Sequence, residues 1–147
     1  MREILFKAKT TKKDNPKHEF SEKWVEGNLI LCGEKAYIHP ISNKIRTTGE
    51  IGRIIVLHEV IPNTICQYTG LTDKNGKKIW ENDICDRKEK YPEIVTYNKG
   101  DWQLDYSYAL GKEKHFCACN LGFYACEREC VEVIGNVFDN PELLEVE

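Results

Sequence analysis

Short apolar segments separated by polar loops run through the first half of the chain. In residues 2–9, Ile4, Phe6 and Ala8 alternate with Leu5 and with charged side chains. This alternation predicts a half-buried strand in which Leu5 lies on the outer face. Strand segments are expected in this half at residues 2–9, 24–31, 37–41 and 53–61.

The second half of the chain has stronger turn signals. Asn75-Gly76 is a tight-turn dipeptide, because both residues tolerate positive φ. Gly135 indicates a bulge or a close approach in the last strand, and Asn140 with Pro141 can begin a short helical turn. The expected strands are 93–97 and 102–106 as one β-hairpin, 115–119 and 123–126 as a second, and 131–138 as the last.

These patterns predict a mainly β, antiparallel protein, because short strands bounded by turn residues predominate and sustained helical periodicity is lacking. We divide the chain into a strand-rich N-terminal segment, residues 1–64, and a C-terminal domain, residues 65–147. About five short strands in roughly 80 residues suit a small barrel, because closing a sheet removes its exposed edges.

Three stretches of the sequence carry a resemblance to a known family. They are REILFK (2–7) with WVEG (24–27), then QYTGLTDKNGKKIWENDI (67–84), and finally VIGNVFDNPELL (133–144). In this order and over nearly the whole chain, they resemble the YopX family of bacteriophage and prophage proteins. The resemblance implies an SH3-like barrel in the C-terminal part, a phage or prophage origin and a setting in the host cytoplasm. It brings no catalytic residue set.

The sequence departs from the family pattern in two places. Asn82 stands where the family usually has glycine, and because asparagine tolerates positive φ best after glycine, the turn should survive. The cysteines between residues 117 and 130 are not part of the family pattern. Any role of these cysteines would therefore be particular to this protein or to a subgroup.

Composition excludes only a few classes of protein. The values of 41% hydrophobic and 31% charged residues are those of a globular chain, which excludes fibrous and wholly disordered classes. No apolar run approaches the roughly 20 residues of a membrane helix, and the start of the chain lacks the long apolar stretch of a signal peptide. We therefore expect a cytoplasmic protein without membrane association.

Charge is distributed unevenly. Residues 1–65 carry 11 basic and 8 acidic side chains, whereas residues 66–147 carry 10 and 16. A basic N-terminal part can bind nucleic acid, but it can equally be a solvated loop, and the net charge of −3 favours the second interpretation. The lysines of the nucleic-acid alternative are Lys7, Lys9, Lys12, Lys13 and Lys17.

The seven cysteines are the feature of the sequence that most suggests a chemical role. Their odd number and the lack of a secretion signal argue against a disulfide framework, so free thiols are the default. Zinc is the alternative, because it takes four nitrogen or sulfur ligands in a tetrahedron, although the usual C-x2-C spacing is missing. The candidate ligands are Cys117, Cys119, Cys126 and Cys130, with His115 in reserve. No other cofactor is expected.

Catalysis has weak support in the sequence. No serine lies in a nucleophile-elbow setting, and His58 in its apolar run reads as a packed or rim histidine. A Cys117–His115 pair on one strand face is the nearest approach to a nucleophile and base. Glu81 and Asp83 flank a turn, where carboxylates commonly bond local backbone groups. We therefore expect no enzyme.

Aromatic side chains favour a binding role. Tyr106 and Tyr108 should share one face of a strand, with Trp102 nearby, and small barrels use such faces to bind peptides or nucleic acids. We expect a non-enzymatic module that binds a host or phage protein, with a homo-oligomer as a further expectation. The alternatives are the nucleic-acid module and a protein that sequesters a small nucleotide signal, which would need a concave polar pocket.

Overall fold

The computed structural model describes residues 2–11, 23–40, 56–111 and 118–146, and it is mainly β with antiparallel pairing, as predicted. Two compact units are present, Met1–Gln67 and Tyr68–Glu147. The division falls inside β5, whereas the sequence suggested one after residue 64. The strands are β1 (Phe6–Lys9), β2 (Trp24–Cys32), β3 (Lys35–Pro40), β4 (His58–Val60), β5 (Cys66–Thr72), β6 (Lys78–Trp80), β7 (Asp83–Asp86), β8 (Glu93–Asn98), β9 (Asp101–Asp105), β10 (Ala118–Asn120) and β11 (Glu132–Asn136).

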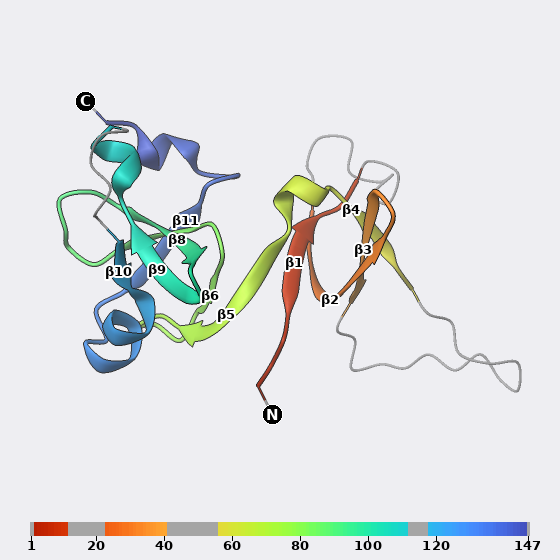
Figure 1. The fold of residues 1–147 in the computed structure, drawn as a ribbon, viewed down its shortest axis with the longest axis horizontal. Coiled ribbons are helices and arrows are strands. Elements are labelled where there is room, and N and C mark those ends of the chain that lie inside the picture. Colours follow the sequence, from red (N-terminus) through yellow and green to blue (C-terminus); the bar gives the residue numbers. More distant parts are fainter. Residues whose placement is uncertain (1, 12–22, 41–55, 112–117, 147) are drawn as a thin grey trace, which may run out of the picture. The chain divides into compact units, whose positions relative to one another are not determined.

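In the N-terminal unit a four-stranded ladder returns to its first strand. The order is β4-β3-β2-β1, and the start of β5 pairs with the other side of β1 (Figure 1). Beyond the end of β1, Thr10 bridges Val60 of β4, and the Ile61 N–H donates to the Lys9 carbonyl at 2.8 Å. The ladder is therefore closed around a small core of Ala8, Ala36, Ile38 and Val60.

The first strand is shorter than the alternation of the sequence indicates. β1 covers only Phe6–Lys9, and the preceding residues have left the ladder. Leu5 is 1% exposed and Ile4 is 56% exposed, the reverse of the predicted faces. The prediction was wrong here because period-two alternation holds only while a chain remains in a strand.

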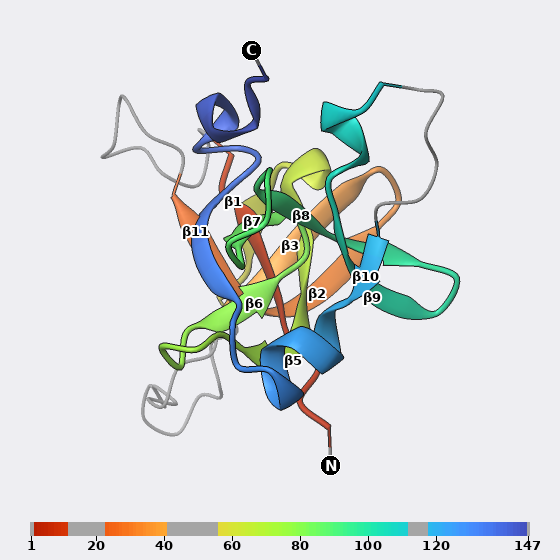
Figure 2. The ribbon, with the colours of Figure 1, turned by 90° about the vertical axis from the view of Figure 1, so that its left-hand side faces the viewer.

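The C-terminal unit contains a five-stranded sheet in the order β10-β9-β8-β7-β11 (Figure 2). Separately, the later part of β5 pairs with β6 at Tyr68 and Trp80, whose rings lie 5.4 Å apart. Trp80 is 4% exposed and therefore buried. In the described residues β10 and β11 are the sheet edges, so closure into an SH3-like barrel stays a prediction. The buried core consists of Ile79, Cys85, Val95, Leu104, Leu121, Ala125, Val131 and Val133.

One of the two predicted hairpins is confirmed and the other is wrong. β8 and β9 pair from Ile94–Asp105 to Asn98–Asp101. Of the second hairpin, β10 pairs with β9 instead, and residues 121–127 are helical, ending in a π-helical turn η5 (Phe123–Glu127). Helical spacing lets Leu121 and Ala125 both enter the core, and the Asn120 side chain accepts the Phe123 N–H at 2.7 Å.

The turn at Asn82 has the geometry expected for a residue that replaces glycine. Its φ is 67°, its N–H donates to Val95 at 2.9 Å, and its carbonyl accepts from Val137 at 3.0 Å. Beside it, the Asp83 carboxylate accepts the Trp80 N–H at 2.8 Å. Asp83 thus has the local backbone role that the sequence predicted.

The close approach predicted at Gly135 is present. The β11–β7 register shifts between Val133 and Gly135, and a Cβ at Gly135 would lie 2.5 Å from Asn140 Oδ1. The short helical turn η6 (Pro141–Leu144) follows, as expected. However, the Asn140 side chain accepts the Asn136 N–H at 3.2 Å rather than capping η6.

Asp73 joins two segments that lie 60 residues apart. Its carboxylate accepts the N–H groups of Asn75 and Lys77 in the β5–β6 turn and of Val133 in β11, each at 2.9 Å. Burial alone raises the pKa of this carboxyl. The three backbone donors and the charge of Lys77 outweigh burial, so the net pKa of Asp73 lies below its ordinary value.

We expect Asp73→Asn to lower the free energy of unfolding at pH 7 by about 2 kcal/mol, because the amide NH2 would face a backbone donor. The stabilisation from ionised Asp73 is present above its ordinary pKa and is lost as pH falls through the lowered pKa. The variant should therefore approach the wild type in acid. Urea unfolding followed by tryptophan fluorescence measures this effect. Asp86→Asn, at a more exposed turn, is the control, and an equal loss there would contradict the assignment.

Candidate functional site

Among the described aromatic residues of the C-terminal unit, the most exposed is Tyr97, at the turn end of the β8–β9 hairpin. Tyr97 and Trp102 are cross-strand partners, with ring centroids 4.9 Å apart in an edge-on arrangement. Trp102 is half-buried and packs against the core, whereas Tyr97 is 57% exposed. This Tyr97–Trp102 pair presents a supported aromatic edge to solvent.

Tyr106 and Tyr108 do not share a strand face, contrary to the prediction. β9 ends at Asp105, whose carboxylate accepts the Ser107 N–H at 2.7 Å and starts the 3-10 turn η4 (Ser107–Ala109). Local side-chain bonding of this kind competes with strand pairing. Both tyrosines are half-buried at the end of β9.

Each of these tyrosines has a fixed neighbour. Tyr106 lies 6.1 Å from Tyr91, and the Tyr108 hydroxyl donates to the Pro92 carbonyl at 2.8 Å. Burial, followed by the charges of Glu93 and Tyr91, raises the pKa of Tyr108. Four residues of extended chain separate Trp102 from Tyr106 by about 13 Å. The predicted binding residues thus form two clusters at opposite ends of the hairpin.

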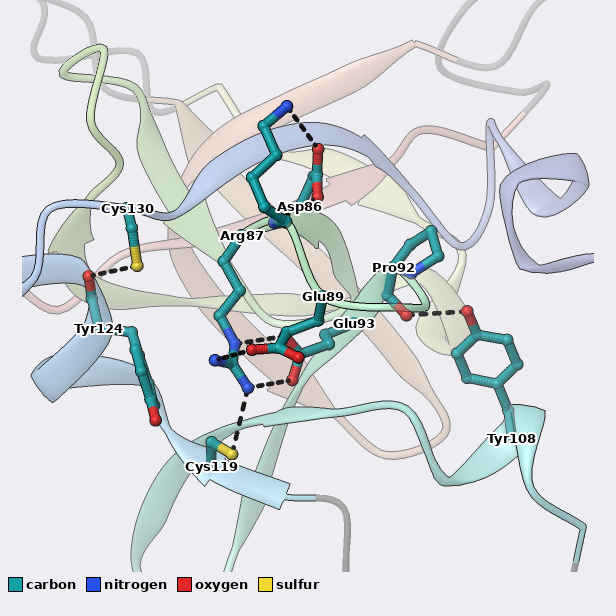
Figure 3. Close-up of polar contacts among 10 residues, drawn as sticks. Asp86, Arg87, Glu89, Pro92, Glu93, Tyr108, Cys119, Tyr124 and Cys130 are labelled. Atoms are coloured by element: carbon teal, nitrogen blue, oxygen red, sulfur yellow. Dashed lines mark hydrogen bonds and ion pairs between the residues drawn. The ribbon is translucent and has the colours of Figure 1, made fainter.

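A buried ion pair lies between β7 and β8 (Figure 3). The guanidinium of Arg87, which follows β7, bonds both carboxylate oxygens of Glu93, through Nε to Oε1 and through Nη2 to Oε2 at 3.4 Å. The two side chains are 8% and 1% exposed. Glu89 adds a more exposed carboxylate at 3.0 Å from Nη1.

The same guanidinium contacts two later elements. It lies over the Tyr124 ring of η5, 4.1 Å from the centroid, and Nη2 donates to the Cys119 thiol of β10 at 3.3 Å (Figure 3). Arg87 therefore contacts three further segments through one planar cation, as guanidinium geometry allows.

Burial and pairing shift the pKa values of Glu93 and Arg87 in opposite directions. Burial raises the pKa of Glu93, and the hydrogen bond and charge of Arg87 offset part of that rise. Burial lowers the pKa of Arg87, but the bond to Glu93 outweighs it, so the net pKa lies above its ordinary value. With both carboxylate oxygens bonded, this arrangement fixes structure rather than presenting an acid or base.

The sequence contains a signal for this ion pair. Glu93 lies two residues before buried Val95, and Arg87 lies two residues after buried Cys85. Alternation therefore places both charges on the core face of the sheet. Because charged side chains are rarely buried without a partner, two inward charges on neighbouring strands predict an ion pair.

Three of the four cysteines predicted as zinc ligands lie within the described residues. Cys117 and His115 lie outside the described residues. Cys119 contacts Arg87, Cys126 is exposed, and the Cys130 thiol donates to the Tyr124 carbonyl at 3.7 Å. Across residues 2–11, 23–40, 56–111 and 118–146 there is no group of three or more His, Cys, Asp or Glu side chains that could hold a metal. The four-thiolate zinc site stays a prediction.

Two of the candidate nucleic-acid lysines share one aromatic neighbour. The Lys7 and Lys9 ammonium groups lie 4.6 and 5.5 Å from the Trp24 ring centroid. Lys12, Lys13 and Lys17 lie outside the described residues. Among the helical segments that the structure describes, none has the length and apolar character to cross a membrane.

Comparisons with known proteins identify a family. The family model described as YopX protein matches residues 10–145. Among solved structures, the crystal structure of protein EF1440 from Enterococcus faecalis is similar, with a TM-score of 0.57 and 22% identity over 99% of this chain and 100% of that one. At this identity the likeness shows the fold. No curated protein matches the chain.

We expect Arg87→Met to lower the free energy of unfolding by about 3–5 kcal/mol at pH 7, because it leaves the Glu93 carboxylate buried without a cation. The loss should shrink towards pH 5, since protonation of Glu93 removes the unpaired charge. Urea unfolding of wild type and variant at both pH values measures this difference.

The double variant Arg87→Met/Glu93→Leu is the matched control. It removes both charges, so it should recover most of the lost stability. If the single and double variants are equally unstable, or if the loss in the single variant does not depend on pH, the ion pair is not what holds this part of the sheet.

Proposed function

This chain belongs to the YopX protein family, and we propose that it is a non-enzymatic protein-binding module. The proposal extends to a phage or prophage accessory protein that acts on a host or phage protein in the bacterial cytoplasm. The family resemblance supports the origin and the setting. The Tyr97–Trp102 pair supports the binding role.

The Tyr97–Trp102 pair has the features of an interaction site. Tyrosine and tryptophan dominate binding energies at protein interfaces, because they bury a large area and lose little conformational entropy. Tyr97 is 57% exposed, so a partner can cover most of its ring, while Trp102 holds it from the core side. Both residues stand on paired strands, which reduces the cost of ordering the site.

The buried titratable groups support a role without catalysis. Glu93 is fully paired with Arg87. Burial, followed by the charge of Asp83, raises the pKa of Cys85, so this thiol stays protonated and cannot act as a nucleophile. These groups stabilise the sheet instead of presenting reactive atoms to a substrate.

We expect Tyr97→Ala to weaken binding of a purified protein partner by roughly 1–3 kcal/mol, as loss of an interface aromatic does. The partner is identified by affinity capture from the host, and its dissociation constant is then measured by calorimetry for wild type and variant. Phe123→Ala is the matched control, because Phe123 is 45% exposed but stands on η5.

Circular dichroism of Tyr97→Ala should match that of the wild type, because the side chain is mostly exposed. Undiminished affinity of a correctly folded Tyr97→Ala variant would refute this location. Equal weakening by Phe123→Ala would place the binding surface elsewhere.

A second candidate function rests on the N-terminal unit. Lys7 and Lys9 both lie against Trp24 on the sheet, and basic groups around an indole can bind single-stranded nucleic acid by phosphate contacts and base stacking. The negative charge of Glu26, the cross-strand partner of Lys7, would repel a polyanion. We therefore rank this function second.

The nucleic-acid alternative makes a distinct prediction. An oligothymidine should bind with an affinity that falls steeply with salt, with a logarithmic slope of about −0.7 for each phosphate neutralised. Lys9→Ala should reduce that slope by about one such unit, and Lys99→Ala, in the β8–β9 turn, should not. Fluorescence anisotropy measures both. If no binding occurs at low salt, this candidate is excluded.

A further inference from the structure

β2 has an edge that no described strand covers. It pairs with β1 only through Trp24–Gly27, whereas it pairs with β3 through Gly27–Cys32. Over the part of the chain that the structure describes, residues 28–32 thus have a strand on one side only. We call this segment the free edge of β2. Its outward backbone N–H and C=O groups can pair with another strand.

The free edge is apolar on both faces. Ile30 is 40% exposed, Leu31 is 70% exposed and Cys32 is also exposed. Consecutive strand residues point to opposite faces, so these three side chains expose apolar surface on both. The segment contains no charge and no proline, the features with which proteins usually block an edge.

A comparison with β11 shows how this chain protects an edge elsewhere. β11 is the last strand of its sheet. There the N–H of Val133 donates to the Asp73 carboxylate, and the N–H of Asn136 donates to the Asn140 side chain. Side chains thus occupy backbone donors of β11, whereas no such bond reaches Asn28–Cys32 from the described residues.

The chemistry of the free edge restricts what can cover it. Its backbone groups require an extended strand, and its two apolar faces favour one without charge. The same segment of a second copy meets both conditions. Leu29-Ile30-Leu31 is an uncharged apolar strand, and its sequence reads the same in both chain directions. Antiparallel pairing related by a two-fold axis then joins identical surfaces.

Charge at the two ends of the free edge agrees with a second copy. Glu26 lies before the edge, and Lys35 is the cross-strand partner of Cys32 at its other end. Strand alternation puts both on the same face of the sheet, and both are exposed. In an antiparallel pair the Glu26 end of each copy meets the Lys35 end of the other, while Glu34 lies in the turn.

We propose that this chain forms a homodimer in which the free edge of β2 pairs with the same segment of a second copy. The two sheets then continue across the axis, and Ile30, Leu31 and Cys32 of each copy are covered. This surface is independent of the Tyr97–Trp102 pair, which stands on another sheet. A dimer formed in this way presents two copies of that pair.

Sedimentation equilibrium of the purified full chain tests the proposal. The wild type should show twice the chain mass at micromolar concentration. Leu31→Asp should raise the dimer dissociation constant about a hundredfold, because each copy brings an unpaired carboxylate into the interface. Val56→Asp is the matched control, since Val56 is 50% exposed in the same unit but outside β2.

Charge exchange provides a second variant that leaves the apolar edge intact. Glu26→Lys and Lys35→Glu should each weaken the dimer, and the double exchange should restore it. A wild type that stays monomeric overturns the proposal, as does a dimer that Leu31→Asp leaves unchanged. A dimer weakened as much by Val56→Asp places the interface elsewhere and also overturns it.

Discussion

The carboxylate of Glu93 is buried in the five-stranded sheet, and an unpaired charge there would cost several kcal/mol. Arg87 supplies the counter-charge, but a guanidinium has five donors and a flat face that also need partners. Glu93 accepts two of these donors, Glu89 and Cys119 accept one each, and the Tyr124 ring covers the flat face. The need to satisfy one buried pair thus draws β7, β8, β10 and η5 together, around a core to which β7, β8 and η5 contribute apolar residues.

Backbone N–H and C=O groups at strand edges also need hydrogen-bond partners, and the chain supplies these partners in different ways. The N-terminal ladder returns from β4 to β1, so those two strands cover one another. At β11, Asp73 and Asn140 provide side-chain acceptors, and Asp73 also fixes the turn between β5 and β6. Asn28–Cys32 has neither solution within the described residues, and the proposed second copy would pair with its backbone groups.

Local signals in the sequence predicted the fold well where the structure is itself local. The β8–β9 hairpin, the Asn82 turn and the bulge at Gly135 depend on neighbouring residues, and all three are present. Residues 123–126, expected as a strand, are helical, because the helical form of residues 121–127 depends on placing Leu121 and Ala125 in a core built by distant strands. Short segments of this kind cannot be assigned from periodicity alone.

The candidate site shows the same contrast between local signals and distant contacts. Trp102 lies on the predicted hairpin, but its partner Tyr97 emerges only from the strand register. The bond of the Asp105 side chain ends β9, so Tyr106 and Tyr108 do not share a strand face. The length of β9 separates them from Trp102. The division has a functional consequence. The Arg87–Glu93 pair and the Tyr91, Pro92, Tyr106 and Tyr108 contacts stabilise one end of the hairpin, and the other end keeps an exposed tyrosine. The contacts that fix the structure thus lie at one end of the hairpin, and the aromatic pair that we propose for binding lies at the other.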